Sequence, residues 1–268
     1  MPELSTLDVW IDTDKGRLFA RRWYPEGGRA AALAPIVMFH ESLGCVDAWR
    51  QFPAALAQAT GREVIAYDRL GFGRSDRYEG MLKPRSFMVE EASDGFDKVK
   101  RALGLRDYVG YGHSVGGAIA MCCAVHHPTS CVGVISESAV VFVEERTVAG
   151  LLQARQTFAD QMQFERLLKY HGDKSRWVLD AWLDTWMSEE MKHWSHDEIL
   201  RQVHCPVLAI QGGNDEFSTH DQPRHIADQV PGETTIAMLD DCGHVPHREK
   251  PAEVLQACRH WLMARKIG

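Results

Sequence analysis

The feature of this 268-residue chain that most constrains its fold is a repeated alternation between short apolar runs and segments with helical spacing. The apolar runs lie at 34–40, 62–68, 106–112, 131–136, 205–212 and 234–240. Short, nearly continuous apolar runs are typical of parallel strands that are buried on both faces. The segments with helical spacing lie between and after them, at 48–60, 87–104, 115–127, 222–230 and 251–266. This alternation predicts a doubly wound, mostly parallel α/β sheet.

The N-terminal segment adds two strands of a different kind. Residues 7–12 and 17–24 alternate apolar and polar side chains on either side of the turn sequence at 13–16. Such alternation is typical of an antiparallel hairpin with one face against a core. The predicted sheet therefore has eight strands.

One long segment interrupts the alternation. Residues 144–197 contain no buried-strand run, and their apolar residues follow helical patterns at 144–170 and 176–194. We therefore predict a helical cap over 144–197, inserted after the sixth strand, with residues 1–143 and 198–268 forming the core domain. The insertion leaves the sheet at the carboxyl end of a strand, where α/β proteins bind ligands, so the cap is expected to cover a ligand site.

The composition restricts the partners of the protein. Hydrophobic residues make up 45% of the chain, which is typical of a globular protein. The net charge is -7, and the 30 basic residues are interleaved with 37 acidic ones, which argues against nucleic-acid binding and favours a small-molecule partner. The seven cysteines form no C-x-x-C pair, and we see no signal peptide and no membrane span, so we predict a cytoplasmic protein. A monomer and a homodimer both remain open.

The sequence around Ser114 has the form Gly-x-Ser-x-Gly, in "YGHSVGG" at 111–117. It follows a predicted strand and precedes a predicted helix, which is the context of a nucleophile elbow. Such a turn lifts the serine hydroxyl above the sheet, and the helix N-terminus favours negative charge that develops nearby. Serine is also a common helix N-cap, so a purely structural interpretation of Ser114 remains the alternative.

Two partners for a serine nucleophile follow buried strands farther along the chain. Asp215 comes just after the run at 205–212, and His244 comes just after the run at 234–240. A weak hydroxyl nucleophile needs a base, and the base needs a carboxylate that orients it. Glu137 also follows a strand, at 131–136, and is the alternative acid.

These residues, in the order Ser114, Asp215 and His244, together with "YDRLGFGRSD" at 67–76 and the last helix in "HREKPAEVLQACRHWL" at 247–262, resemble the α/β-hydrolase family. The resemblance covers nearly the whole chain and is to the cap-bearing, esterase-like branch. It implies that Ser114 is the nucleophile, His244 the general base and acid, and Asp215 the residue that fixes the imidazole tautomer.

The resemblance also implies an oxyanion hole made of two backbone N–H groups. One is that of Val115, and the other is that of Ser42 in the loop "HESLGC" at 40–45. Glu41 occupies the position where the family usually has glycine. A carboxylate at the oxyanion site would oppose the developing negative charge, so we expect Glu41 to point away and to be held by a neighbouring donor that stabilises the turn.

The remaining candidates concern the substrate pocket. Glu41, His113, Trp182 and Trp186 are candidate pocket residues. Tryptophans of the insertion either line an apolar pocket or close a helical core; the residues concerned are Trp177, Trp182, Trp186 and Trp194. In the loop at 67–76, Arg69, Arg74 and Asp76 are expected to hold that loop by ion pairs and hydrogen bonds.

We expect neither a metal nor a cofactor. Three histidine pairs are close enough in sequence to be ligands: His126 with His127, His193 with His196, and His244 with His247. None of them has a convincing third ligand.

The sequence therefore predicts a serine hydrolase that cleaves a carboxylic ester or a related small acyl compound through an acyl-enzyme intermediate. One alternative is a hydrolase of carbon–carbon bonds in a diketone-like compound. Another is a receptor-like protein that binds a ligand with little turnover.

Overall fold

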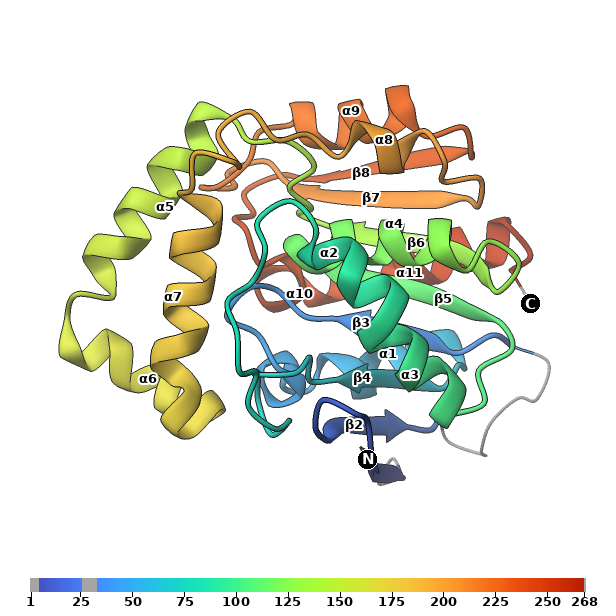
Figure 1. The fold of residues 1–268 in the computed structure, drawn as a ribbon. Coiled ribbons are helices and arrows are strands. Elements are labelled where there is room, and N and C mark those ends of the chain that lie inside the picture. Colours follow the sequence, from blue (N-terminus) through green and yellow to red (C-terminus); the bar gives the residue numbers. More distant parts are fainter. Residues whose placement is uncertain (1–4, 26–32, 268) are drawn as a thin grey trace.

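A computed structural model of the protein describes residues 5–25 and 33–267. It contains an eight-stranded sheet with the order β1-β2-β4-β3-β5-β6-β7-β8 (Figure 1). The strands are β1 (Thr6–Ile11), β2 (Leu18–Trp23), β3 (Ile36–Phe39), β4 (Val64–Tyr67), β5 (Tyr108–His113), β6 (Cys131–Glu137), β7 (Val207–Gly212) and β8 (Thr234–Leu239). The predicted fold class is confirmed. Residues 1–4, 26–32 and 268, which the predicted core domain includes, lie outside the described residues.

The sheet is parallel except at its N-terminal edge. β1 pairs antiparallel with β2, and β2 pairs antiparallel with β4. The pairs from β4 through β3, β5, β6 and β7 to β8 are all parallel. The parallel strands from β3 to β7 are buried along almost their whole length, because helices cover both faces of the sheet. This burial explains why their sequences are continuously apolar.

Helices pack on both faces of the sheet. On one face, α1 (Phe52–Thr60) and α11 (Pro251–Ala264) enclose a core that includes Leu56, Ile135 and Trp261. The other face carries α2 (Phe87–Glu90), the π-helical turn η2 (Glu91–Gly95), α3 (Phe96–Ala102), α4 (Val115–His126), α8 (Asp197–Leu200) and α9 (Asp221–Gln229). Two short helices belong to loops, η1 (Val46–Trp49) and α10 (Pro246–Glu249).

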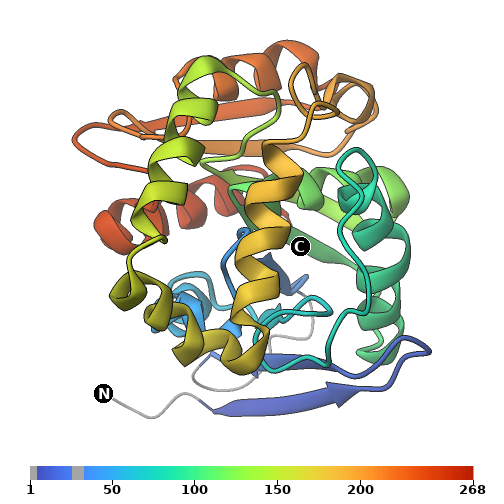
Figure 2. The ribbon, with the colours of Figure 1, turned by 60° about the vertical axis from the view of Figure 1, so that its left-hand side comes forward.

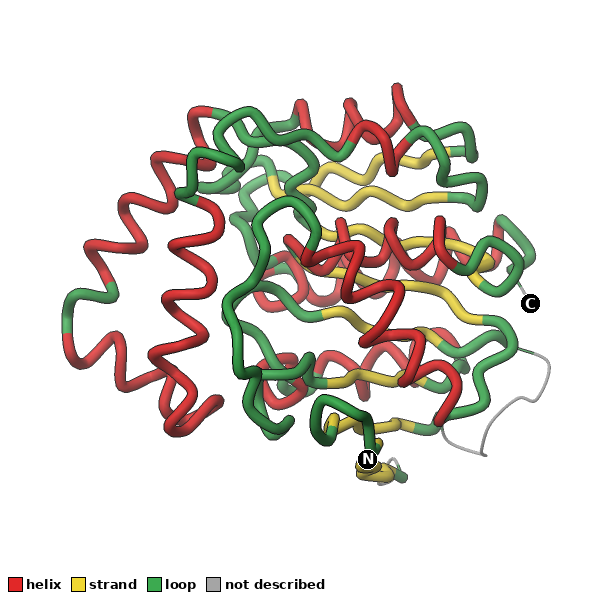
Figure 3. Tube along the Cα trace, viewed as in Figure 1, coloured by secondary structure: helices red, strands yellow, loops and turns green. Residues whose placement is uncertain are grey.

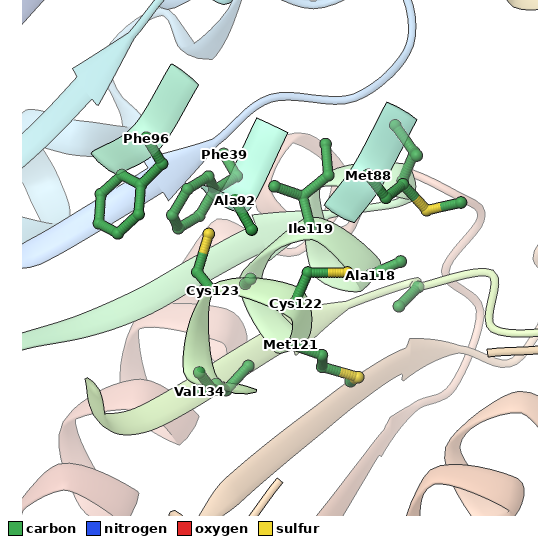
Figure 4. Close-up of a cluster of buried hydrophobic side chains, with 14 of the residues drawn as sticks. Phe39, Met88, Ala92, Phe96, Ala118, Ile119, Met121, Cys122, Cys123 and Val134 are labelled. Atoms are coloured by element: carbon green, nitrogen blue, oxygen red, sulfur yellow. The ribbon is translucent and has the colours of Figure 1, made fainter. Parts of the chain in front are cut away.

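The helix α4 is the most deeply buried helix of the core. Its residues from Val115 to Ala124 are all buried. Figure 4 shows Ile119 and Cys123 of α4 beside Phe39, Ala92 and Phe96, which come from β3 and from the helices over the sheet. Because α4 is packed on all sides, the turn that precedes it has a fixed position.

The segment after β6 forms three helices that stand apart from the strands. They are α5 (Glu145–Thr157), α6 (Gln161–His171) and α7 (Ser175–Trp186), with the short η3 (Gly172–Lys174) between the last two. Figure 3 shows them as a separate group at one end of the sheet, and Figure 2 shows α5 and α7 passing across that end. At their base the chain meets itself, since Phe142 and Ser195 form an antiparallel bridge. We call this group of helices the cap.

Within residues 5–25 and 33–267, no helix combines the length and the apolar character that crossing a bilayer requires.

Candidate active site

Ser114 stands at the sharp turn between β5 and α4. Its backbone angles are φ 54° and ψ -123°, a conformation that residues other than glycine rarely adopt. The neighbouring glycines make the turn possible: a Cβ at Gly112 would collide with the backbone of Gly116, and one at Gly116 would collide with the carbonyl oxygen of Phe39. Backbone strain of this kind persists where the surrounding structure enforces it, often at functional sites.

The three residues of the predicted triad lie in hydrogen-bond contact. Ser114 Oγ is 3.1 Å from His244 Nε2. His244 Nδ1 is 2.9 Å from Oδ1 and 2.8 Å from Oδ2 of Asp215. When Nδ1 carries the imidazole proton and donates a hydrogen bond to the carboxylate, Nε2 has a free lone pair that can accept a hydrogen bond from the Ser114 hydroxyl.

Asp215 is fully buried and its carboxylate is surrounded by donors. Oδ1 accepts hydrogen bonds from the backbone N–H groups of Phe217 and Ser218, at 2.8 and 3.1 Å. Oδ2 accepts hydrogen bonds from Gln211 Nε2 and Ser218 Oγ, both at 2.8 Å. These contacts fix the carboxylate in the orientation that the imidazole needs.

The charges of the pair reinforce each other. Burial alone would raise the pKa of Asp215, but the hydrogen bond and charge of His244, with the donors from Phe217 and Ser218, lower it to about 2. Burial alone would lower the pKa of His244, but the hydrogen bond and charge of Asp215, together with the charges of Glu216 and Glu41, raise it. The surroundings of His244 therefore favour its protonated form.

Glu137, the alternative acid, contacts a different histidine. Its carboxylate binds His247 Nδ1 at 3.0 and 3.1 Å and accepts a 2.7 Å hydrogen bond from the hydroxyl of Tyr111. The backbone N–H of His247 also donates to Glu137 Oε1, at 2.5 Å. Glu137 therefore binds the loop after β8 through His247. Within the described residues, its carboxylate makes no hydrogen bond to His244.

His113 supports the same loop from the other side. Its Nε2 donates a 2.7 Å hydrogen bond to the carbonyl oxygen of His244, and its ring lies 5.0 Å from that of His247. Burial lowers the pKa of His113 to about 3, so the ring is neutral. His113 therefore holds the backbone of His244 without adding a charge beside it.

The loop after β3 brings Ser42 to the same cavity as Ser114. Val115 is the first residue of α4, so its N–H lies at the helix N-terminus beside Ser114. Glu41 Oε2 accepts a 2.5 Å hydrogen bond from the backbone N–H of Leu43, two residues ahead. The carboxylate of Glu41 is therefore used to close the turn of its own loop.

A cavity of about 600 Å³ extends from Ser114 to the underside of the cap. All four candidate pocket residues, Glu41, His113, Trp182 and Trp186, line it. The other two tryptophans of the insertion do not: Trp177 packs on Phe72 and Tyr78, and Trp194 packs on Trp186 and His196. Both proposed roles of cap tryptophans therefore occur, at different positions.

The walls of the cavity under the cap are predominantly apolar. Trp182 lies between Phe158 and Phe217, with ring centroids 6.4 and 6.1 Å apart, and Phe217 lies 4.8 Å from the ring of His244. Further apolar walls are formed by Leu43, Val140, Leu151 and Ala154. Polar residues line the cavity beside Ser114 and His244 and also on α5, at Gln153 and Thr157, so the site combines a polar centre with a predominantly apolar chamber.

Within the described ranges, no cluster of three histidine, cysteine, aspartate or glutamate residues has an arrangement that could hold a metal ion. His247 is engaged by Glu137, and His196 Nε2 lies 3.2 Å from the carbonyl oxygen of Ala118.

Several contacts around the site were not predicted from the sequence. His40 and Arg69 contact the carbonyl oxygen of Glu41, and His171 of the cap contacts that of Leu43. The sequence offered one signal for His40, its place as the first residue of the loop at 40–45 that carries Ser42, which we call the oxyanion loop. It offered none for His171, because the partner of a cap residue depends on how the insertion folds back.

Comparisons with known proteins agree with this geometry at the level of the family. The profile described as "Alpha/beta hydrolase family" matches residues 11–257. The 2-hydroxymuconate semialdehyde hydrolase of Pseudomonas sp. strain CF600 is 36% identical over 95 residues, which is 35% of this chain and 32% of that protein. The proline iminopeptidase of Lactobacillus delbrueckii subsp. bulgaricus is 22% identical, over 89% of this chain and 92% of the relative.

A solved structure is similar over nearly the whole fold. A putative lipase from Acinetobacter baumannii AYE superposes with a TM-score of 0.77 at 14% identity, over 98% of this chain and 92% of the other. Such a likeness concerns the fold, and the family follows from the profile match over most of the chain. The eight-stranded sheet, the strained serine turn and that match lead to one conclusion: the chain belongs to the alpha/beta hydrolase family.

Proposed function

We propose that this protein is a serine hydrolase that cleaves a carboxylic ester or a related small acyl compound through an acyl-enzyme intermediate. The observation that carries the proposal is the continuous hydrogen-bonded chain from Ser114 Oγ through His244 to Asp215 beside a cavity of about 600 Å³. This arrangement matches what nucleophilic catalysis by a hydroxyl requires.

In the proposed reaction, Ser114 Oγ attacks the carbonyl carbon of the substrate while His244 Nε2 takes the hydroxyl proton. The resulting oxyanion is bound by the backbone N–H groups of Val115 and Ser42. The bond to the leaving group breaks, and His244 gives its proton to the leaving oxygen. A water molecule then attacks the acyl-enzyme with His244 as base, which releases the carboxylic acid and restores Ser114.

The shape of the cavity supports an acyl group of moderate length and apolar character. Trp182, Phe158 and Phe217 enclose the space between Ser114 and the cap, and burying a methylene there is worth about 0.8 kcal/mol. Longer acyl chains should therefore bind better until the chamber is filled.

A second candidate is hydrolysis of a carbon–carbon bond in a diketone-like compound. It is favoured by the 36% identity over 95 residues to a 2-hydroxymuconate semialdehyde hydrolase. The same nucleophile and base serve both reactions, so the two candidates differ in the substrate that the cavity accepts.

The test is a panel of p-nitrophenyl esters of increasing chain length, assayed beside a vinylogous diketone. The proposal expects the esters to be the best substrates, with kcat/KM rising with chain length and then levelling off. Turnover of the diketone alone would replace the proposal by the second candidate. Binding of these compounds without turnover of any of them would support the receptor-like alternative.

A further inference from the structure

The loop that carries Ser42 is held by several hydrogen bonds to its backbone groups. The carbonyl oxygen of Glu41 accepts hydrogen bonds from His40 Nδ1 at 2.8 Å, from Arg69 Nη2 at 3.1 Å and from the backbone N–H of Gly44 at 3.1 Å. This is an unusually large number of donors for one carbonyl, which has two lone pairs. The direction of the Glu41 carbonyl is therefore fixed.

The direction of that carbonyl determines the direction of the Ser42 N–H. The C=O of Glu41 and the N–H of Ser42 belong to the same planar peptide group, and the described chain contains no cis peptide bond. In a trans peptide the two groups point in opposite directions. Donors that hold the Glu41 carbonyl on one side therefore orient the Ser42 N–H on the other, and a charged donor also polarises the peptide and strengthens that N–H.

The position of Arg69 is fixed by burial and by contacts with Phe72 and His40. It is almost fully buried, its guanidinium lies 4.3 Å from the ring centroid of Phe72, and its backbone N–H and Nε donate to His40 Nε2 at 3.2 and 3.3 Å. Arg69 therefore contacts Phe72 in its own loop and also connects that loop to the oxyanion loop. Arg74 connects the same loop to Asp47 of η1.

His171, at the end of α6 in the cap, holds the next part of the loop. Its Nδ1 accepts a 2.9 Å hydrogen bond from the backbone N–H of Gly73, so its proton is on Nε2, which donates to the carbonyl oxygen of Leu43 at 3.0 Å. Between these two contacts, the Glu41 carboxylate holds the Leu43 N–H. Three successive peptide groups, from Glu41 to Gly44, are thus fixed in turn.

We propose that Arg69 and His171 are positioning residues for the oxyanion hole, and that His171 couples the orientation of the Ser42 N–H to the cap through its own two hydrogen bonds. This inference rests on the proposed function, because it takes the Ser42 N–H to be a donor to the oxyanion. It goes beyond that function in linking the cap, which forms the substrate chamber, to the hydrogen-bond donor that acts in the transition state.

The test uses His171→Ala and His171→Gln in the full-length protein, with the preferred p-nitrophenyl ester as substrate. We expect His171→Ala to lower kcat by roughly tenfold or more with little change in KM, since losing an oxyanion donor outright costs about 100-fold to 1000-fold and a displaced donor costs less. His171→Gln should recover most of kcat, because its amide can accept from Gly73 and donate to Leu43.

A transition-state analogue separates positioning from general damage. A trifluoromethyl ketone forms a tetrahedral adduct with the serine, whose oxyanion occupies the hole, whereas the matching methyl ketone binds mainly by its apolar parts. His171→Ala and Arg69→Lys should weaken the first inhibitor by about the factor lost in kcat. The affinity for the methyl ketone should remain near that of the wild type.

Lys174→Met is the matched control. Lys174 also connects the cap to the loop after β4, through the carbonyl oxygens of Phe72 and Ser75, but it does not touch the oxyanion loop. The Lys174→Met variant should have a lower melting temperature than the wild type but the same kcat and the same affinity for the fluorinated ketone. If His171→Ala keeps the wild-type kcat, or if Lys174→Met loses as much kcat as His171→Ala, the inference is wrong.

Labelling with a fluorophosphonate distinguishes this failure from failure of the proposed function. A wild-type protein that is not labelled at Ser114 overturns both proposals. A wild-type protein that is labelled, together with an Arg69→Lys variant and a His171→Ala variant that are labelled at the same rate, overturns the positioning inference alone.

Discussion

Glu137 and His247 form a buried hydrogen-bonded pair, with 3.0 Å between Oε2 and Nδ1. His247 follows His244 by three residues, and its backbone N–H also donates to Glu137. The pair therefore anchors the short segment that carries the proposed catalytic base. Its carboxylate resembles a catalytic acid in position along the chain, but its contacts are those of a structural support.

This pair leads to a prediction that separates the two acids. Asp215→Asn should lower kcat by about 1000-fold to 10,000-fold, because an amide in place of the carboxylate no longer fixes the imidazole tautomer or stabilises the imidazolium. Glu137→Gln should lower the melting temperature and keep kcat within about tenfold of the wild type. Steady-state kinetics and thermal unfolding of both variants check this. A larger loss of kcat in Glu137→Gln than in Asp215→Asn would show that the acid is Glu137.

The pH dependence of activity follows from the charges around His244. Only the neutral imidazole can take the serine proton, so kcat/KM should rise with pH. Asp215, Glu216 and Glu41 raise the pKa of His244, so the midpoint should lie above the ordinary value of 6.5. Glu216→Gln removes one of these charges and should move the midpoint to lower pH. A midpoint in the wild type below 6.5 would contradict the charge distribution described above.

The stability of the fold should also depend on pH. Burial lowers the pKa of His113 to about 3, and those of His171 and His196 to about 4, against 6.5 for an ordinary histidine. The unfolded chain therefore binds more protons than the folded one between about pH 4 and 6.5, and stability rises with pH across that window by about 1.4 kcal/mol per pH unit for each proton.

Urea unfolding at pH 5 and pH 7 measures this effect. The free energy of unfolding should be larger at pH 7. His196→Asn should show a smaller difference between the two values, since one of the neutral histidines is gone. Equal free energies at both pH values in the wild type would mean that these histidines are not buried in their neutral form.

The role of Glu41 is tested by a pair of variants. Glu41→Gln keeps an oxygen that accepts from the Leu43 N–H, so kcat should stay within a few-fold of the wild type. Glu41→Ala removes the acceptor, loosens the oxyanion loop and should lower kcat by about tenfold. A loss of about 1000-fold in Glu41→Gln, as for deletion of an oxyanion donor, would mean that the carboxylate takes part in the reaction.

The sequence carried enough information for the sheet because its signals are local. Buried strands such as β5 and β7 are short apolar runs, and the residues that come shortly after each run lie at the same edge of the sheet, which places both Ser114 and Asp215 there. The turn at Ser114 was predictable for the same reason. Its close backbone contacts require glycine at 112 and 116, and both lie within two positions of the serine.

The supporting contacts were not predictable because they join segments far apart in the chain. The partner of Glu137 is His247, and the partner of the Leu43 carbonyl is His171, separated by 110 and 128 positions. Glu137 ends β6 and Asp215 follows β7, and these strands are adjacent in the sheet, so spacing alone does not tell which acid faces His244. Only the paths of the loops after β7 and β8 decide this.

The most direct test of the proposed function is the mass of the intact protein after reaction with a fluorophosphonate. The reagent transfers its phosphonyl group to an activated serine as fluoride leaves, so it reports the nucleophile without assuming a substrate. We expect one adduct per wild-type chain, located on the peptide that contains Ser114, and none in Ser114→Ala with the same melting temperature. A wild-type protein that stays unmodified, or a Ser114→Ala variant that is modified to the same extent, would contradict the assignment of Ser114 as the nucleophile.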